Sequence, residues 1–296
     1  MSLSMRRSPH DGKPYTVDGV DLVDICLHVG TVGGQGVGRA VMMTGVSLTN
    51  IALQSAAWTT TAYATTSIVA KCRGKALEER LILAPKITVA WAQRVNRIFG
   101  VTIEYTERTQ RMLAERCPRV LLFNHCSTYD VVCVGGLLPS GGVIVAKEEL
   151  LNMPFVGSGL NAMGSIFLNR SDRQASYDSL MKAGQRLRSE QLQVLIAPEG
   201  RRSDSEVLQR FRLGAFQLAA LSEAPVVPIV IHGAHKVWPK GAFAPQPGRI
   251  VVDVLETMAP PLSSDRAALI DYAERTRNLY LQAMETGPVE DSKPKT

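Results

Sequence analysis

Two residues that could transfer a proton, His125 and Asp130, lie five positions apart directly after the apolar run 120–123. The run is short, bulky and bounded by charged and polar residues, which predicts a buried strand. Positions i and i+5 of a helix point in different directions, so we expect His125 in the loop after the strand and Asp130 in the first turn of the next helix. The carboxylate could then hold one imidazole nitrogen and leave the other free to accept a proton. The alternative is a capping loop that merely contains a histidine.

Three further segments follow in the chain, at residues 164–170, 197–203 and 226–230. Arg170 ends the first of them, just after a predicted strand, and its forked guanidinium suits phosphate oxygens. The charged positions also have ordinary interpretations. Arg170 could pair with Asp172 at the surface, residues 147–149 could be a solvated helix start, and residues 198–200 could form a turn. The order of the three segments behind His125 is harder to explain in that way.

In order and spacing, these segments resemble the PlsC-like glycerolipid acyltransferases, the family of 1-acyl-sn-glycerol-3-phosphate acyltransferase. Residues 124–130 match the first family block, N-H-x-x-x-x-D, and residues 164–170 match the second, G-x-I-F-x-x-R. The third block is usually P-E-G-T-R-S, and here Arg201 replaces the threonine. The fourth block is an apolar strand around a proline, matched at Pro228. With two linking pieces, at residues 146–157 and 211–216, the resemblance covers roughly residues 90–260.

The resemblance implies a set of site residues. His125 is the expected general base and Asp130 the residue that orients it. The acceptor's phosphate needs cations in fixed positions, and the carboxylate Glu199 suits a glycerol hydroxyl or an orienting contact within the site. A glycine lets the backbone approach a ligand closely. The residues expected on the substrate side are Lys147, Arg170, Glu199, Gly200 and Arg202.

The implied reaction moves a fatty acyl chain from acyl-CoA or acyl carrier protein to the free hydroxyl of a lysophospholipid, with lysophosphatidate giving phosphatidate as the leading case. An acyl thioester is already activated, so direct attack suffices and no cofactor besides the acyl donor is expected. No G-x-S-x-G elbow indicates a serine hydrolase. Arg201 adds charge beside the expected phosphate site and could indicate a larger or more anionic acceptor.

Three alternatives remain open from the sequence. The same transfer could use another lysolipid, such as a lyso-aminolipid or a glycolipid. A lipid-binding protein without catalysis is another class, and the intact His125 and Asp130 argue against it. A metal hydrolase would need more ligands, because His232 and His235 form an isolated H-x-x-H without an evident third ligand. We therefore expect no metal site.

The composition fits an enzyme that works on anionic lipids. The 296 residues are enough for one large domain or a domain with an extension, and 45% of them are hydrophobic. Lys and Arg total 33 against 27 acidic residues, a formal net charge of +6 that suits anionic headgroups or phosphorylated substrates. Aromatic residues make up only 6% and do not alternate with basic ones, which argues against nucleic acid.

Cysteine usage is typical of a reduced, cytoplasmic compartment. None of the five cysteines forms a CxxC pair, and their spacings do not resemble a zinc ribbon. Cys126 is adjacent to the expected base, but a neighbouring side chain on such a turn need not face the same site. We therefore do not assign it as a nucleophile.

The first hundred residues divide into two predicted parts. Residues 1–38 form an extension that could be disordered, with no signal peptide, and the glycines at 33–38 fail the G-x-G-x-x-G spacing. Residues 39–100 form a helical, membrane-associating segment. Within it, residues 40–70 carry no charge and are long enough to cross a bilayer, but they are rich in Ser, Thr, Asn and Gln. An interfacial or protein-packed helix is the preferred interpretation.

A second helix is indicated by an apolar stripe at intervals of three and four residues: Leu81, Ala84, Ile87, Trp91, Val95 and Ile98. Gly100 should end it, and Pro85 should break or kink it. The stripe could pack on the protein's own core or lie in the lipid headgroup layer. Basic residues just upstream, Lys71, Arg73, Lys75 and Arg80, favour the second interpretation. We expect a monotopic or peripheral enzyme on the cytoplasmic face of an anionic membrane.

Beyond Gly100, short apolar strands alternate with helical stretches. The expected strands are 101–105, 120–124, 143–145, 165–168, 194–196, 226–231 and 250–254, and a last amphipathic helix covers 269–283. This alternation predicts an α/β fold, a mixed sheet flanked by helices, as in the glycerolipid acyltransferases. We expect residues 101–296 to form the acyltransferase domain.

Overall fold

The computed structural model describes residues 47–153, 155–168, 173–203 and 205–288, together with a short antiparallel pair, β1 (Thr16–Val17) and β2 (Val20–Asp21). The predicted extension lies mostly outside the described residues, and so do its glycine segment and residues 40–46. Arg170 and Asp172 also lie outside them.

A seven-stranded sheet forms the centre of the molecule, with the strand order β3-β9-β8-β4-β7-β5-β6. Its strands are β3 (Val101–Tyr105), β4 (Arg119–Phe123), β5 (Gly142–Lys147), β6 (Ile166–Leu168), β7 (Gln193–Ile196), β8 (Val226–His232) and β9 (Gly248–Val254). Only β8 and β9 pair antiparallel, so the sheet is mixed, as predicted. The carboxyl ends of β4, β5, β7 and β8 therefore meet at one edge.

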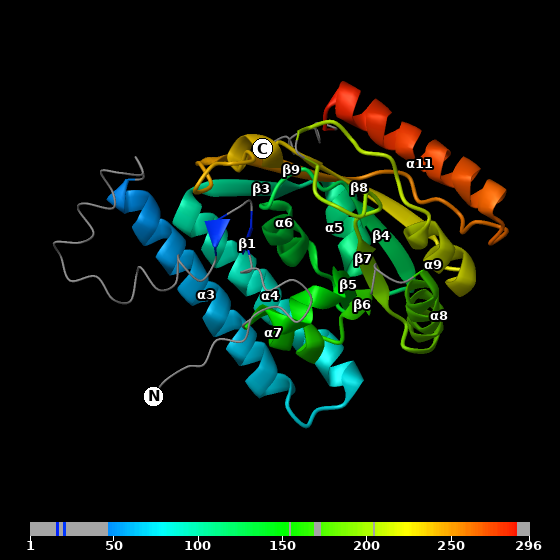
Figure 1. The fold of residues 1–296 in the computed structure, drawn as a ribbon, viewed down its shortest axis with the longest axis horizontal. Helices are drawn as coiled ribbons and strands as arrows, with labels where there is room; N and C mark the ends of the chain where they lie inside the picture. Colours follow the sequence, from blue (N-terminus) through cyan, green and yellow to red (C-terminus); the bar gives the residue numbers. More distant parts are fainter. Residues whose placement is uncertain are drawn as a thin grey trace.

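Helices cover both faces of the sheet (Figure 1). They are α3 (Leu48–Cys72), α4 (Leu77–Phe99), α5 (Glu107–Ala114), α6 (Asp130–Leu137), α7 (Val156–Ala162), α8 (Arg173–Ser189), α9 (Gly214–Ser222), α10 (Ala234–Val237) and α11 (Arg266–Thr286), with a 3-10 helix at Glu148–Asn152. Successive residues of β4 enter different cores. Leu121 packs in the cluster that contains α4 and α6, and Leu122 in the cluster that contains α8, α9 and α11.

Helix α4 runs without a break through Pro85, so the predicted break is wrong. Proline has no N–H, which leaves the carbonyl of Leu81 without its usual partner in the helix. The N–H of Gly141, just before β5, donates to that oxygen at 2.9 Å. A contact from a distant segment thus satisfies the carbonyl that Pro85 frees. Gly100 ends the helix in the left-handed conformation, with φ of 65°, as expected.

The apolar stripe of α4 faces the protein and not a lipid layer. Leu81, Ala84 and Val95 are buried in the two cores, so the headgroup interpretation of this stripe is wrong. Two of the basic residues upstream of it also serve the protein itself. Arg80 donates to the carbonyls of Asn161 and Ala162 at the end of α7, and Lys75 pairs with Glu79 of α4.

Helix α3 places two of its polar side chains, Gln54 and Thr61, against the protein, as the protein-packed interpretation predicts. Gln54 donates to the carbonyl of Phe243 at 2.6 Å, and Thr61 accepts from the indole N–H of Trp91 in α4 at 3.0 Å. Across residues 47–288, as far as they are described, no helix has the combination of length and apolar character that a bilayer crossing needs.

Tyr280 of α11 joins β4 to β8 beside Pro228. Its fully buried phenol donates to the carbonyl of Leu122 at 2.8 Å and accepts from the N–H of Ile229 at 3.1 Å. The last helix is thereby attached to the central strand just before His125.

Candidate active site

The loop after β4 brings His125 and Asp130 together. His125 lies in this dyad loop (residues 124–129), and Asp130 is the first residue of α6, as the spacing predicts. The Nδ1 atom of His125 lies 2.8 Å from Oδ2 of Asp130. The same oxygen accepts from the backbone N–H groups of Cys126 and Ser127, each at 2.8 Å. Asp130 is fully buried, whereas 23% of the His125 side chain is exposed, so the histidine can meet a substrate and the aspartate cannot.

Asn124 fixes the start of the dyad loop to the neighbouring strand. Its Oδ1 atom accepts from the N–H of Ile231 at 2.7 Å, and its Nδ2 atom donates to the carbonyl of the same residue at 3.1 Å. Asn124 is buried, and this pair of bonds continues the ladder between β4 and β8 by one side chain. The position of His125 is therefore set on its amino-terminal side before any substrate binds.

Glu199 holds the dyad loop from the other side. It lies in the third-block loop (residues 197–209), which follows β7, and it is buried. Its Oε1 accepts from the N–H of His125 at 2.7 Å and its Oε2 from the N–H of Gln209 at 2.9 Å. Burial raises the pKa of the Glu199 carboxyl, and the two N–H donors oppose that rise. Of its two expected functions, the geometry favours the orienting contact over a bond to a substrate hydroxyl.

Gly200 and Arg202 are both close to the dyad loop in this arrangement. Gly200 has φ of 72°, a conformation that side chains disfavour, and a Cβ atom there would meet Arg212 at 2.6 Å. The positive φ therefore favours glycine at this position, and the side chain of Arg212 fills the space beside it. Arg202 donates from Nη1 to the hydroxyl of Thr128, and the next N–H, of Ser203, donates to the carbonyl of His125 at 2.7 Å.

Of the remaining substrate-side candidates, Lys147 lies further along the same edge of the sheet. Lys147 is the last residue of β5 and is exposed. Arg170 follows the end of β6 by two residues in the sequence and lies outside the described residues. Arg201, which replaces the threonine of the family block, is exposed. The structure therefore gathers His125, Asp130, Glu199, Gly200 and Arg202.

Cys126 has the environment of an inert thiol. Burial raises its pKa strongly, and the nearby carboxylates of Asp130, Glu199 and Glu206 raise it further. A hydrogen bond from the backbone of His235 only partly opposes this rise. Because the thiolate is the nucleophilic form, these surroundings argue against covalent catalysis by Cys126.

One member of the isolated histidine pair, His235, lies against a carboxylate. His235 Nδ1 lies 2.5 Å from Oε1 of Glu206. Burial lowers the pKa of His232, the last residue of β8. Within the part of the chain that the structure describes, no three His, Cys, Asp or Glu side chains are grouped so that they could hold a metal ion.

The sequence patterns assign no function to several residues that shape the site. Asn124 is only a letter of the first block, Tyr280 is only a member of the last amphipathic helix, and Gln209 and Glu206 belong to no pattern. Their contacts join segments far apart in the chain, as between Tyr280 and Leu122. A polar residue inside an apolar stripe, such as Tyr280, is a weak signal that could have pointed to a buried hydrogen bond.

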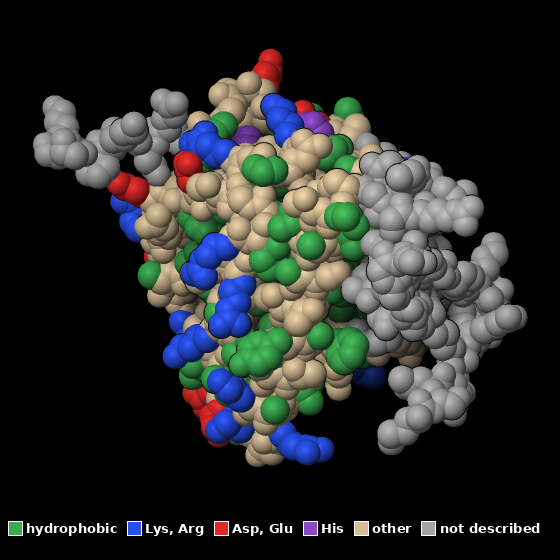
Figure 2. Space-filling model, turned by 90° about the vertical axis from the view of Figure 1, so that its left-hand side faces the viewer, with side chains coloured by type: hydrophobic (Ala, Val, Ile, Leu, Met, Phe, Trp, Pro, Cys, Tyr) green, Lys and Arg blue, Asp and Glu red, His purple; other side chains and the backbone are tan. Residues whose placement is uncertain are grey.

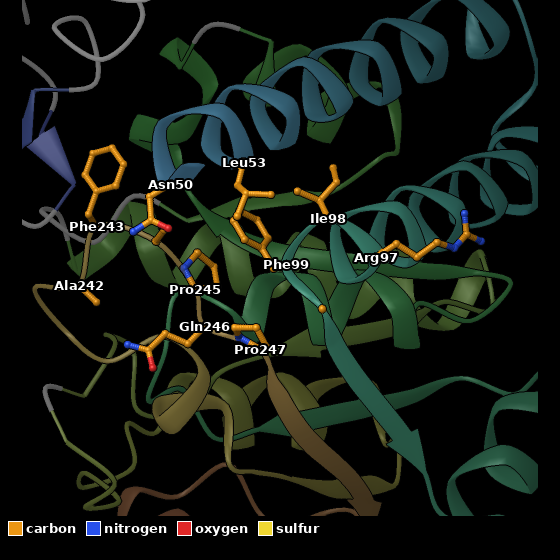
Figure 3. A pocket seen from close by; sticks show the side chains of 12 residues that line it. Asn50, Leu53, Arg97, Ile98, Phe99, Ala242, Phe243, Pro245, Gln246 and Pro247 are labelled. Atoms are coloured by element: carbon orange, nitrogen blue, oxygen red, sulfur yellow. The ribbon is translucent and has the colours of Figure 1, made fainter. Parts of the chain in front are cut away.

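A pocket of about 500 Å³ lies between α3, the end of α4 and residues 242–247 (Figure 3). Leu53, Phe99 and Pro245 supply apolar walls. The pocket is lined by none of the residues that surround His125. It is therefore separate from the dyad and is not assigned to the chemistry.

Comparison with known proteins identifies the family. A model of the family described as Acyltransferase matches residues 101–232, a range that holds the dyad loop and the third-block loop. The human 1-acyl-sn-glycerol-3-phosphate acyltransferase beta is 31% identical over 201 residues, which cover 67% of this chain and 72% of the human protein. The chain belongs to the PlsC-like glycerolipid acyltransferase family.

Other members of the PlsC-like family match over less of their length. The 1-acyl-sn-glycerol-3-phosphate acyltransferase of Limnanthes alba is 30% identical over 190 residues, 62% of this chain and 64% of that protein. The Saccharomyces cerevisiae enzyme of the same name is 31% identical over 173 residues, 57% of this chain and 56% of that protein. The chain thus spans less than two thirds of these two relatives.

A solved structure shares the fold. The crystal structure of the 1-acyl-sn-glycerophosphate (LPA) acyltransferase PlsC from Thermotoga maritima aligns with a TM-score of 0.67 and 21% identity, covering 83% of this chain and 97% of that one. The expected glycerolipid acyltransferase fold, a mixed sheet flanked by helices, is therefore confirmed.

Proposed function

We propose that this protein transfers a fatty acyl chain from a thioester donor, acyl-CoA or acyl carrier protein, to the free hydroxyl of lysophosphatidate, giving phosphatidate. The observation that carries the proposal is the contact of His125 with the fully buried Asp130, at the carboxyl end of the central strand. The names of the human, Limnanthes and yeast relatives support lysophosphatidate as the acceptor.

The proposed mechanism uses His125 as the general base. Asp130 accepts a hydrogen bond from the N–H at Nδ1, which leaves the lone pair on Nε2 free to receive the proton of the acceptor hydroxyl. The hydroxyl oxygen attacks the thioester carbonyl carbon, and the thiol leaves with a proton from the imidazolium. Asp130 stabilises that imidazolium by its charge. The thioester needs no further activation, so no cofactor takes part.

Cations at the sheet edge bind the acceptor's phosphate in this proposal. Arg202 is already beside the dyad loop through Thr128, and Lys147 lies at the end of β5. Arg170 is proposed as a third cation because it is the arginine of the second family block. Glu199 and Gly200 act on the loop and its backbone, not on the ligand. Arg201 supplies an additional exposed charge that favours a strongly anionic headgroup.

In this proposal, residues 39–100, which precede the acyltransferase domain, form the membrane-associating segment. Its helices α3 and α4 lie against the membrane surface. Lys and Arg side chains form a column beside hydrophobic ones on the side of the molecule where α3 lies (Figure 2). The exposed basic residues of this region include Arg73, Lys86, Arg94 and Arg97. A cytoplasmic leaflet would let a water-soluble donor reach an acceptor held in lipid.

The membrane part has its own test, flotation with anionic vesicles. Reversal of charge at Arg73, Lys86, Arg94 and Arg97 leaves the buried apolar stripe of α4 intact. Each basic residue near an anionic surface is worth about 1 kcal/mol, so binding should weaken at least about tenfold. Salt should weaken the binding of the unchanged protein as well. Undiminished flotation of the reversed variant would exclude the electrostatic contact.

The experiment that tests the activity is an assay of purified protein with a panel of lysolipids and two donors, acyl-CoA and acyl carrier protein. Lysophosphatidate should be the best acceptor, ahead of lyso-aminolipids and glycolipids. Transfer to none of the acceptors, together with lysolipid binding, would instead indicate a lipid-binding protein without catalysis.

A further inference from the structure

The dyad loop lies between two flanking segments, and polar contacts join it to each of them. On one side, the third-block loop contributes the N–H of Ser203 to the carbonyl of His125 at 2.7 Å. On the other side, Ser127 donates from its hydroxyl to the carbonyl of Trp238, just after α10, at 3.0 Å. The backbone of His235 in α10 also hydrogen-bonds the Cys126 thiol. The loop that carries His125 is thus held from both sides.

Glu206 and His235 connect the two flanking segments to each other. Glu206 lies at the tip of the third-block loop and His235 lies in α10, with Oε1 and Nδ1 2.5 Å apart. The charge of Glu206 also reaches the Cys126 thiol, which follows His125 directly. The contact between Glu206 and His235 therefore joins the two segments that hydrogen-bond the dyad loop.

The third-block loop needs such a contact because apolar burial does not hold its tip. Ser205, Glu206 and Val207 are all exposed. Inside the loop, Ser203 donates from its hydroxyl to the carbonyl of Val207 at 2.9 Å, but this bond does not fix the tip to the rest of the protein. Segments with little apolar burial open at low free-energy cost.

We propose that Glu206 and His235 form a clasp that positions the third-block loop, and with it Arg202, against the dyad loop. The clasp rests on the proposed function, because Arg202 is its candidate phosphate-binding residue. Glu206 and His235 are positioning residues and touch no reacting atom. The titratable groups that sense the charge of Glu206 are Cys126 from the dyad loop and His232 from β8.

The expected effect is limited by the exposure of the pair. The Glu206 side chain is 50% exposed and the His235 side chain 26%. Partly exposed contacts, even between charged groups, change an equilibrium only about twofold to fivefold. Loss of the clasp should therefore raise the acceptor KM by about that factor, while the donor KM stays unchanged.

The test compares Glu206→Gln, His235→Gln and the double variant with a matched control, Arg188→Gln. Arg188 pairs with Glu223 at 3.1 Å, an exposed ion pair at the opposite edge of the sheet. Amide hydrogen exchange of residues 201–209 is measured together with the KM for lysophosphatidate and for the donor. We expect faster exchange and a raised acceptor KM in each single variant, no further change in the double variant, and unchanged values in the control.

Three results would overturn the clasp: unchanged exchange in residues 201–209, effects that add in the double variant, or equal effects in Arg188→Gln. The exchange measurement does not depend on activity. If the unchanged protein transfers no acyl chain but the single variants exchange faster, the clasp stands and the proposed function fails.

Discussion

The two sides of the site are built differently. On the dyad side, His125, Asp130 and Glu199 are fixed by several buried or partly buried hydrogen bonds before a ligand arrives. On the proposed phosphate side, Lys147 and Arg201 are exposed. A base must be placed to within a fraction of an ångström, whereas a long cationic side chain can reach a headgroup from several positions. The difference suggests a rigid reaction centre with an adaptable headgroup site.

The rigid side should be the most sensitive to a small change, Asp130→Asn. An asparagine could place its one oxygen where Oδ2 accepts these three bonds, but it carries no negative charge to hold the imidazole in the required tautomer and to stabilise the imidazolium. We expect kcat to fall by at least about a hundredfold, because the base loses that support. Steady-state kinetics measure this, with Asp271→Asn, an exposed carboxylate on α11, as the control. A loss below tenfold would mean that Asp130 does not orient the base.

Substitutions on the adaptable side should weaken binding of the acceptor. A charged hydrogen bond to the acceptor phosphate is worth about 1.5–3 kcal/mol, so Arg170→Ala should raise the acceptor KM at least about tenfold. Lys147→Ala should raise it less, because an exposed lysine makes a looser contact. Neither should change the donor KM. An altered donor KM with an unchanged acceptor KM would reassign Arg170 to the donor.

The rigid side should also lose stability when Tyr280 is replaced by Phe. The change leaves the carbonyl of Leu122 and the N–H of Ile229 buried and unpaired. Such groups cost about 1–3 kcal/mol of unfolding free energy. Urea unfolding measures the loss, with Tyr177→Phe as a control, since Tyr177 is exposed on α8. Equal stability of Tyr280→Phe and the unchanged protein would contradict a stabilising role for the two hydrogen bonds of the phenol.

The smallest effect is expected for Cys126→Ala, although this residue follows His125 directly. Its raised pKa keeps the thiol neutral at physiological pH, and the thiolate should appear only in more alkaline solution. We expect kcat within about twofold of the unchanged protein, as for substitutions that remove no named function. Rapid alkylation of Cys126 at neutral pH with loss of activity would contradict this.

Local patterns in the sequence were sufficient for the sheet and for the dyad. The strands β4 to β9 contain short apolar runs, because buried strands need continuous apolar residues, and β3 alternates apolar with polar residues, as a half-exposed strand does. The spacing from His125 to Asp130 placed one residue in a loop and the other in a helix, which the structure confirms. In both cases the deciding interactions lie within a few residues in the chain.

Contacts between distant segments could not be predicted in this way. The break expected at Pro85 does not occur because Gly141 satisfies the carbonyl of Leu81. The stripe of α4 is equally apolar whether it faces a lipid or a core, so periodicity alone could not decide between them. The hydrogen bonds of Tyr280 and the contact of Glu206 with His235 have no local signature.

The central claim is that His125 is the base, and the turnover of His125→Ala tests it most directly. Both substrates should be saturating, and circular dichroism should show that the variant is folded. A general base contributes about 10²–10⁴ to a rate, so kcat should fall by that factor while the unfolding midpoint stays the same. A folded His125→Ala variant with near-normal turnover would contradict the mechanism.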